Sequence, residues 1–322
     1  MADATLRKLV TDKAVTDIAI IDDLVNASGI LQTATVIPSS HGKFHKYKKV
    51  SALPTASFRE IGGSYTDQTV NDEIHQLDLK MIGLVQSEDK AICDEIGVQK
   101  YFTQGRPAVM EALGQKIADG IIYGTNSTYG DTQAFRGWHE MADAAGSSYY
   151  TDVGGGDAST TTIFVVKYKM GVNGLVYNSA TVNGGSLIKT TVLNNAQPVL
   201  EYTAAGTKKP VYQVLYETDM AYLNASIHSV HALVGIDASN DVTDIDMKKA
   251  IDSVKGTAFD TFIYTSRMGK RSIEKLNSGD LQTIPATNDY NTLITYFNGI
   301  PIVVDENINE DDTLSNLPYG LS

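Results

Sequence analysis

One stretch, residues 87–124, constrains the fold of this chain more than any other. Its apolar residues recur at steps of three, four or seven, the spacing that places side chains on one face of an α-helix. They are Val98, Phe102, Val109, Leu113, Ile117 and Ile121. The polar residues of the opposite, solvent-facing side are Glu111, Gln115, Lys116 and Asp119. The pattern predicts a long amphipathic helix, although a helix of this kind is also common in the core of proteins that pack helices on a sheet.

Both ends of this predicted helix carry a signal. Ser87 can cap the N-terminus, with Glu88 and Asp89 in a first turn where the helix dipole favours negative charge. Gly124 provides a flexible stop. Pro107 lies inside the pattern and donates no backbone hydrogen bond. We therefore expect it either to kink one long helix or to begin a second one.

Charge and cysteine content exclude several classes of protein. The net charge of -12 argues against a surface that grips nucleic acid, because such surfaces need clustered lysine and arginine. Cys93 is the one cysteine, which excludes disulfides within the chain and metal sites built from several thiolates, and we expect it to be a small buried apolar group. No segment resembles a signal peptide or approaches the length of a membrane span, so we expect a soluble intracellular protein.

The first part of the chain predicts an arm followed by a long β-hairpin. Residues 3–27 have a weakly helical pattern, and residues 41–50 then contain Lys43, Lys46, Lys48 and Lys49. Residues 73–86 alternate between apolar and polar side chains, which predicts a half-buried strand. The polar segment between them holds Pro54, Gly62 and Gly63, as the tip of a hairpin would. An isolated hairpin is marginally stable in water, so we expect another copy of the chain to cover it.

The lysine cluster has two interpretations of equal weight. Lysines commonly protect the exposed edge of a strand from unwanted pairing. Alternatively, they form a basic ribbon that contacts an acidic neighbour, for which residues 87–95 and 305–312 are the candidates.

The rest of the chain predicts a mixed α+β region. Residues 143–160 contain three successive glycines and predict a surface loop. Strands are expected over 161–170, 174–180 and up to residue 218, whereas 222–237 fits a strand or a short helix. The predicted order after residue 244 is helix, strand, helix, strand; the strands are 259–266 and 297–308.

No catalytic motif is present. The chain contains no GxGxxG, no P-loop and no GxSxG, and His139-Glu140 lacks the second histidine of a zinc-protease helix. His228 and His231 are spaced for a metal on a helix, but no third ligand lies near them in the sequence. A metal-dependent hydrolase built on His139, Glu140, His228 and His231 is the enzyme alternative.

Several segments, in this order, resemble the major capsid proteins of tailed bacteriophages with the Hong Kong 97 type fold, and within them the short-tailed-phage branch. Residues 51–63, SALPTASFREIGG, are similar to the extended-loop segment of that branch, and IIYGTN with AFRGW in 121–138 is similar to the end of its spine helix. Similar segments follow at 165–177, 216–237, 262–276 and 297–308. The resemblance covers most of the chain and implies an α+β fold with an N-terminal arm, an extended β-hairpin loop, a spine helix and a mixed axial domain.

This resemblance implies how the chain is divided. Residues 1–38 would be the arm, 39–87 the extended loop, 88–129 the peripheral domain with the spine helix, and 130–322 the axial domain with returning peripheral strands. The expected intersubunit interface lies on the extended loop and consists of Phe44, Lys46, Tyr47, Lys48, Lys49, Leu53, Pro54, Phe58, Arg59 and Leu77. No catalytic residue, cofactor or metal is implied.

The resemblance also implies the partners. Copies of the chain would assemble into hexamers and pentamers of an icosahedral shell that encloses double-stranded DNA without binding it specifically. Scaffold, portal and decoration proteins are further possible partners; no membrane is involved. The protein would be found in the virion after assembly in the bacterial cytoplasm. An encapsulin-like nanocompartment shell is the alternative with the same fold, and it would carry a pocket for cargo peptide near its N-terminus.

Overall fold

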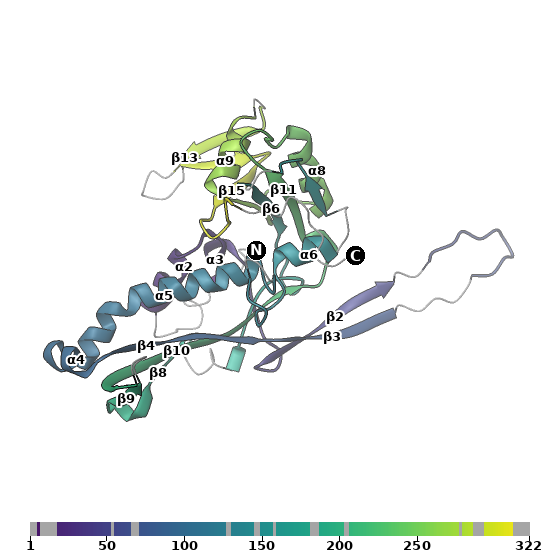
Figure 1. The fold of residues 1–322 in the computed structure, drawn as a ribbon. Coiled ribbons are helices and arrows are strands. Elements are labelled where there is room, and N and C mark those ends of the chain that lie inside the picture. The colour runs from purple at the N-terminus through teal and green to yellow at the C-terminus, as the bar shows by residue number, and fades with distance from the viewer. Residues whose placement is uncertain are drawn as a thin grey trace.

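The computed structural model describes residues 5–6, 18–52, 55–65, 71–126, 130–144, 149–156, 159–180, 187–202, 206–276, 279–285 and 293–311. An elongated body carries a rounded lobe on one side, and a hairpin projects from one end of the body (Figure 1). The predicted fold class, α+β, is confirmed by this arrangement of helices and sheets.

The body is a sheet covered by helices. Its strands are β1 (Val36–Pro38), β4 (Lys80–Asp89), β7 (Asn173–Tyr177), β8 (Lys189–Val192), β9 (Val199–Tyr202) and β10 (Lys208–Asn224). They pair in the order β1-β7-β10-β4, and β8 and β9 also pair with β10; the 3-10 helix η1 (Leu193–Ala196) joins β8 to β9. The helices are α2 (Ile18–Asn26), α3 (Gly29–Thr33), α4 (Lys90–Ile96), α5 (Val98–Ile122) and α6 (Trp138–Ala144).

The helix predicted over 87–124 is present as two helices, and the break between them is not at Pro107. Ser87 lies in β4, and Asp89 caps α4 by accepting a hydrogen bond from Ala91 N at 2.8 Å. The break lies at Gly97, whose positive φ of 95° is a conformation that glycine adopts readily. Pro107 lies inside α5 with its ring exposed. The expectation of a helix start at Pro107 was therefore wrong, because the glycine ends α4 ten residues earlier.

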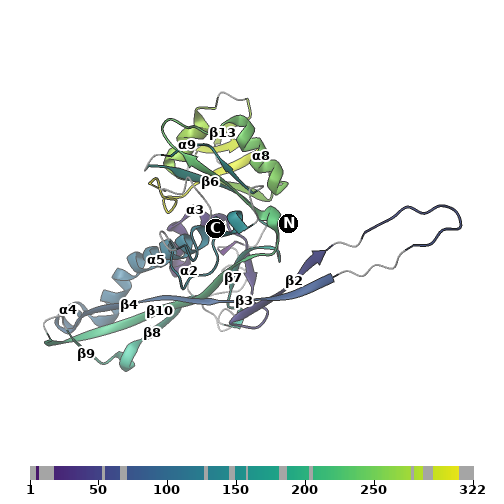
Figure 2. The same ribbon diagram turned by 45° about the vertical axis from the view of Figure 1, so that its right-hand side comes forward.

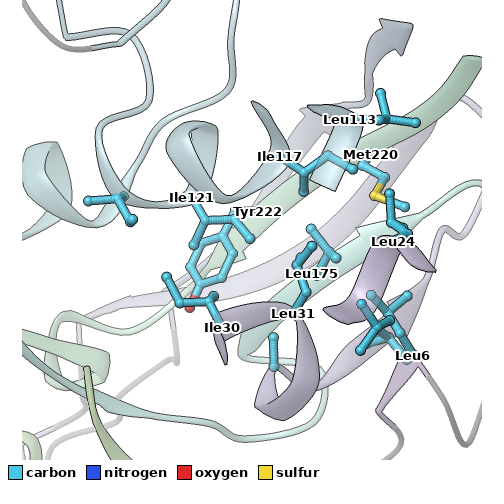
Figure 3. Packing of buried hydrophobic residues seen from close by; sticks show 14 of the residues in the cluster. Leu6, Leu24, Ile30, Leu31, Leu113, Ile117, Ile121, Leu175, Met220 and Tyr222 are labelled. Atoms are coloured by element: carbon cyan, nitrogen blue, oxygen red, sulfur yellow. The ribbon is translucent and has the colours of Figure 1, made fainter. Parts of the chain in front are cut away.

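The core of the body lies between α5, the N-terminal helices and the sheet. Figure 3 shows Leu113, Ile117 and Ile121 of α5 facing Met220 and Tyr222 of β10. Leu24, Ile30 and Leu31 close this core from α2 and α3, and all three are fully buried. Residues 18–38, predicted as part of an arm, therefore pack into the body.

The lobe is a second sheet with helices on its outer face. Its strands are β5 (Tyr150–Asp152), β6 (Thr161–Lys167), β11 (Val230–Ile236), β12 (Thr261–Thr265), β13 (Leu281–Pro285), β14 (Leu293–Phe297) and β15 (Ile300–Val304). They pair in the order β13-β14-β15-β12-β6-β11-β5. Helices α8 (Asp244–Val254) and α9 (Arg267–Glu274) pack on β6, and the 3-10 helix η2 (Ile227–Ser229) precedes β11. The helix–strand–helix–strand order predicted after residue 244 is confirmed, whereas β13 and β14 were not predicted.

Part of the predicted loop 143–160 forms a strand. Tyr150–Asp152 is β5, which pairs in parallel with β11 at the edge of the sheet. Just beyond it, Gly155 N donates to Gly235 O at 2.8 Å. A Cβ atom at position 155 would lie 2.3 Å from that oxygen, so the glycine permits this approach. One of the three glycines that suggested a loop, Gly155, therefore permits a close contact between two segments.

Buried polar contacts join the lobe to the body. Asp305, which follows β15, accepts hydrogen bonds from the Ser28 hydroxyl and from Ile30 N at the start of α3. Tyr264 of β12 is hydrogen-bonded to Thr33 at 2.6 Å, and Asn309 N donates to the Tyr123 hydroxyl at 2.9 Å. The lobe and the body are thus held together by contacts distant in sequence.

Candidate assembly surface on a projecting hairpin

The hairpin consists of β2 (Phe44–Ala52) and β3 (Asn71–Asp78), which pair with each other in an antiparallel ladder. The predicted strand 73–86 is split, because residues after Leu79 belong to β4 and pair with β10 in the body. The alternation also changes phase at this point. Leu77 and Leu79 are half-buried, but Met81 and Val85 are exposed and Ile82 and Leu84 face inward. The expectation of one half-buried strand over residues 73–86, with a single alternation throughout, was therefore wrong.

One face of the hairpin base contacts the body of its own chain. Tyr47 and Leu77 pack against a small cluster of buried apolar residues formed by Ile37, Val176 and Leu223. The Tyr47 ring stacks on His75 with 5.6 Å between the ring centroids. Burial raises the pKa of the Tyr47 hydroxyl and lowers that of His45. These contacts fix the direction in which the hairpin leaves the body.

The opposite face of the hairpin is open to solvent. Lys46 and Lys48 are exposed, and so is Ile74, which is paired with Lys48 across the ladder. The Lys46 ammonium lies 5.7 Å from the centre of the Phe44 ring, and that ring stacks on His41 at 4.8 Å. The lysines predicted to form a basic ribbon thus lie beside an exposed isoleucine, on the face that has no body beneath it. The Lys49 side chain lies outside the described residues.

The described part of the tip, residues 55–65, extends away from the rest of the molecule (Figure 2). Phe58 and Ile61 are fully exposed. Arg59 instead turns back onto its own loop, where its guanidinium donates to Gly63 O at 2.8 Å and lies 5.2 Å from the centre of the Tyr65 ring. Leu53 and Pro54, also predicted for the interface, lie outside the described residues.

The two acidic candidates for a contact with the lysines differ in how far their carboxylates are already engaged. Asp305 is buried at the start of α3, Glu306 forms an ion pair with Arg267, and Glu310 accepts from Met268 N at 2.7 Å. In 87–95, Glu88 accepts from the Tyr101 hydroxyl and Asp94 pairs with Lys90, but Glu95 is exposed on α4. Figure 1 shows α4 at the opposite end of the body from the hairpin.

The histidines of the enzyme alternative have separate environments. His139 is buried beside Tyr123, and burial lowers its pKa to about 4. His231 is hydrogen-bonded to Thr151 at 3.1 Å and also has a pKa lowered to about 4 by burial, whereas His228 contacts the Tyr149 hydroxyl at 3.2 Å. Glu140 accepts a hydrogen bond from the Thr125 hydroxyl. Within the described ranges, no three histidine, cysteine or acidic side chains are grouped as metal ligands.

Cys93 is fully buried in α4, as predicted, and burial together with the charge of Glu88 raises the pKa of its thiol. Ile92 and Ile96 of the same helix are exposed, however, so only one face of this short helix contributes to the core. Among the described residues, no helix has both the length and the apolar content needed to cross a membrane.

Two charged residues of α5, Asp119 and Arg106, line cavities, which the sequence analysis did not predict for either. Asp119, predicted to face solvent, is half-buried in a cavity of about 180 Å³ that Lys116 and Asp131 also line. Burial raises the pKa of Asp119 to about 6; the Lys116 charge opposes this shift and Asp305 adds to it. Arg106 lines a larger groove on the other half of the helix. Helical periodicity gave no signal for either residue. It separates the buried face of a helix from the exposed face, but it does not reveal a cavity at the border between the two faces.

The comparisons with known proteins agree with the geometry. A family model described as major capsid protein GP7 matches residues 12–314. No curated protein matches the chain. A chain in the solved structure of bacteriophage Epsilon15 is 14% identical, with 86% of each chain covered and a TM-score of 0.58. A chain of the bacteriophage JBD30 capsid is 12% identical over 87% of this chain and 90% of that one, with a TM-score of 0.50. The predicted Hong Kong 97 type fold is confirmed by these neighbours.

Proposed function

This chain belongs to the major capsid protein GP7 family, and we propose that it assembles by laying its β2–β3 hairpin across the next copy in the shell. As a member of that family it is a structural subunit of an icosahedral phage head and not an enzyme. Self-association into the shell is therefore its function. The proposal concerns the element that carries the contact.

The observation that carries the proposal is the exposure of apolar side chains on an element with no core of its own. Phe58 and Ile61 are fully exposed at the tip, and Ile74 is 77% exposed on the open face. A two-stranded hairpin is marginally stable in water unless something covers it. A second copy that covers these side chains would supply the missing burial.

The contact would be heterologous, because the hairpin is an extension at one end of the body and has no counterpart at the other (Figure 1). Contacts of this kind close into rings when the rotation between neighbours is suitable. Rings of five and six copies, the pentamers and hexamers of an icosahedral head, satisfy this condition.

The lysines and the apolar residues would contribute differently to this contact. Exposed lysine–carboxylate pairs stabilise by only ~0 to 1 kcal/mol each, so Lys46 and Lys48 would mainly select the register of the contact. Burial of apolar area, at roughly 25 cal/mol per Å², would provide most of the affinity. Glu95 on α4 is the best placed acidic partner for the lysines, because the acidic residues 305, 306 and 310 are engaged within the chain.

The division into an arm (1–38), an extended loop (39–87), a peripheral domain (88–129) and an axial domain (130–322) remains part of the proposal. The hairpin proper, 44–78, would be the functional unit of the extended loop, and the lobe would be the axial domain. The head would enclose double-stranded DNA without gripping it, since the net charge is -12. Scaffold, portal and decoration proteins, and assembly in the host cytoplasm, belong to the same proposal.

The test is charge reversal of the three lysines on β2. We expect the combined variant Lys46→Glu, Lys48→Glu and Lys49→Glu to form few or no shells while its monomer remains folded. The matched control replaces the same three lysines by arginine, which keeps the charge and should assemble. Sedimentation and negative-stain microscopy measure the assembled fraction, and circular dichroism measures folding. Normal shells from the glutamate variant would refute the proposal.

A further inference from the structure

A groove of the body has the shape and charge to receive part of another copy. It has a volume of about 590 Å³ and lies between the first half of α5 and the strands β8 and β10. Its walls are largely apolar and include Phe102, Ile188, Val192 and Val214. This volume falls within the range of roughly 300–1,000 Å³ that is typical of ligand pockets.

The groove contains one positive charge that the chain itself does not balance. Arg106 lines it, and the Nε atom of this arginine is buried without a hydrogen-bond partner in the structure. No carboxylate of the described residues forms an ion pair with Arg106, whereas Lys189, the other cation of the groove, lies 3.6 Å from Glu217. Arg106 is half-buried, and leaving its buried Nε–H without an acceptor is costly, so the groove is suited to a carboxylate.

Arg106 and the glycine before it both lie on the part of α5 that is close to the sheet. A Cβ atom at Gly105 would lie 2.5 Å from Nε2 at the end of the Gln86 side chain of β4, so the glycine leaves room for that side chain between α5 and the sheet. Arg106, the next residue, lines the groove together with Tyr216 of β10. Burial raises the pKa of the Tyr216 hydroxyl and the charge of Arg106 opposes that shift, which agrees with their proximity.

The hairpin tip has the complementary composition. Phe58 and Ile61 are fully exposed, and Glu60 between them is exposed and makes no ion pair or hydrogen bond through its carboxylate within the described part of the chain. The positive charge of Arg59 is turned back onto Gly63 and Tyr65. The tip therefore presents two apolar side chains and one free carboxylate.

The tip and the groove lie at opposite ends of the molecule. In both ribbon views the first half of α5, with β8 beside it, is at the end away from the hairpin (Figures 1 and 2). A tip therefore cannot reach the groove of its own chain, but it can reach that of a second copy placed head to tail.

We propose that the groove beside Arg106 receives the hairpin tip of a second copy, with Phe58 or Ile61 in the apolar part and Glu60 paired with Arg106. The inference rests on the proposed function of the hairpin and adds the surface that receives it. The apolar side chains would supply affinity, and the Glu60–Arg106 pair would fix how far the tip enters.

A charge swap tests the pair. We expect Arg106→Glu and Glu60→Arg each to lower the assembled fraction by about tenfold, because each leaves two like charges in a buried contact. The double variant should regain most of the wild-type yield, because it restores an opposite pair. Thermal unfolding of each unassembled variant reports whether it has folded. Normal assembly of folded single variants, or a double variant that assembles no better than they do, would overturn the inference.

A cysteine pair tests the same contact independently of charge. In Ile61→Cys with Val192→Cys, the tip carries one thiol and the mouth of the groove the other, and the native Cys93 is buried. We expect oxidised shells to yield a ladder of linked subunits. The matched control, Ile61→Cys with Ile245→Cys, places the second thiol on the exposed start of α8 in the lobe and should yield none. Linkage of the control pair alone, or of neither pair, would place the tip elsewhere.

The two proposals fail in different ways. If reversal of the β2 lysines prevents assembly but Arg106→Glu and the cysteine pair show no contact, the hairpin carries the assembly contact and the groove does not receive it. If shells form normally even with the lysines reversed, the proposed function fails first.

Discussion

The spine helix α5 and the hairpin use the same kinds of apolar side chain in opposite ways. Ile117 and Ile121 of α5 are fully buried against the sheet and the N-terminal helices (Figure 3). Phe58 and Ile61 of the hairpin are fully exposed. Contacts within the chain fold the body, whereas under the proposed function contacts between chains would complete the hairpin. Substitutions in the two regions should therefore affect different measurements.

The largest effect on the isolated subunit is expected in the body. Ile117→Ala removes buried methyl and methylene groups from the core beneath α5 and leaves a cavity, so we expect a loss of about 2–5 kcal/mol in the free energy of unfolding. Trp138, the one tryptophan, is fully buried in the core and provides a fluorescence signal for urea unfolding.

The matched substitution in the hairpin is Ile61→Ala, which removes the same groups from an exposed position. We expect it to change the free energy of unfolding by less than about 0.5 kcal/mol. A similar loss in both variants would show that the hairpin packs on its own body in solution, and the comparison between the two regions would fail.

The elements that were predicted correctly from the sequence are those marked by a local pattern. The apolar period and Gly124 identified α5 and its end, because both are local properties of a helix that packs on one side. The polar segment with Gly62 and Gly63 identified the hairpin tip for a similar reason. The acidic candidate 305–312 could not be ranked from sequence, because the partners of Asp305 are Ser28 and Ile30, far away in the chain.

The sequence predictions were wrong where one continuous stretch of chain passes from one pairing strand to another. Residues 71–89 alternate almost continuously, but the half-buried side chains are at odd positions up to Leu79 and at even positions from Ile82, where the chain passes from β3, paired with β2, to β4, paired with β10. Period-two patterns do not identify the pairing strand. Gly97 was overlooked for a similar reason: Pro107 is the stronger local signal, although a proline on the exposed side of a helix can be accommodated.

The pH dependence of the free energy of unfolding provides a further test of burial, at a charged residue of α5. Burial raises the pKa of Asp119 to about 6, with Asp305 adding to the shift and Lys116 opposing it. Because this pKa is higher in the folded chain than in the unfolded one, the folded state binds more protons between about pH 4 and pH 6. Through this residue, the free energy of unfolding decreases as the pH rises through that window and stays lower above it.

Asp119→Asn removes this charge. We expect the variant to be more stable than the wild type by on the order of 1 kcal/mol near pH 7.5, a value reduced for solvent screening in a half-open cavity, and equally stable near pH 4. His139, with its pKa lowered to about 4, titrates in both proteins and cancels in the difference. A difference that does not vary with pH would show that the Asp119 carboxylate is solvated like a surface group.

A substitution at the hairpin tip is expected to have the smallest effect on the stability of the isolated subunit. It should also show the largest difference between its effect on the subunit and its effect on shell assembly. Phe58→Ala shortens a fully exposed side chain, so the free energy of unfolding of the monomer should change by less than about 0.5 kcal/mol. If the side chain is buried between copies, the same substitution removes apolar contact at every interface of the shell. At roughly 25 cal/mol per Å², that loss raises the subunit concentration needed for assembly. The critical concentration, measured by light scattering against Phe58→Leu as an apolar control, should rise for alanine and change little for leucine. An alanine variant with an unchanged critical concentration would show that exposure at the tip has no role in assembly.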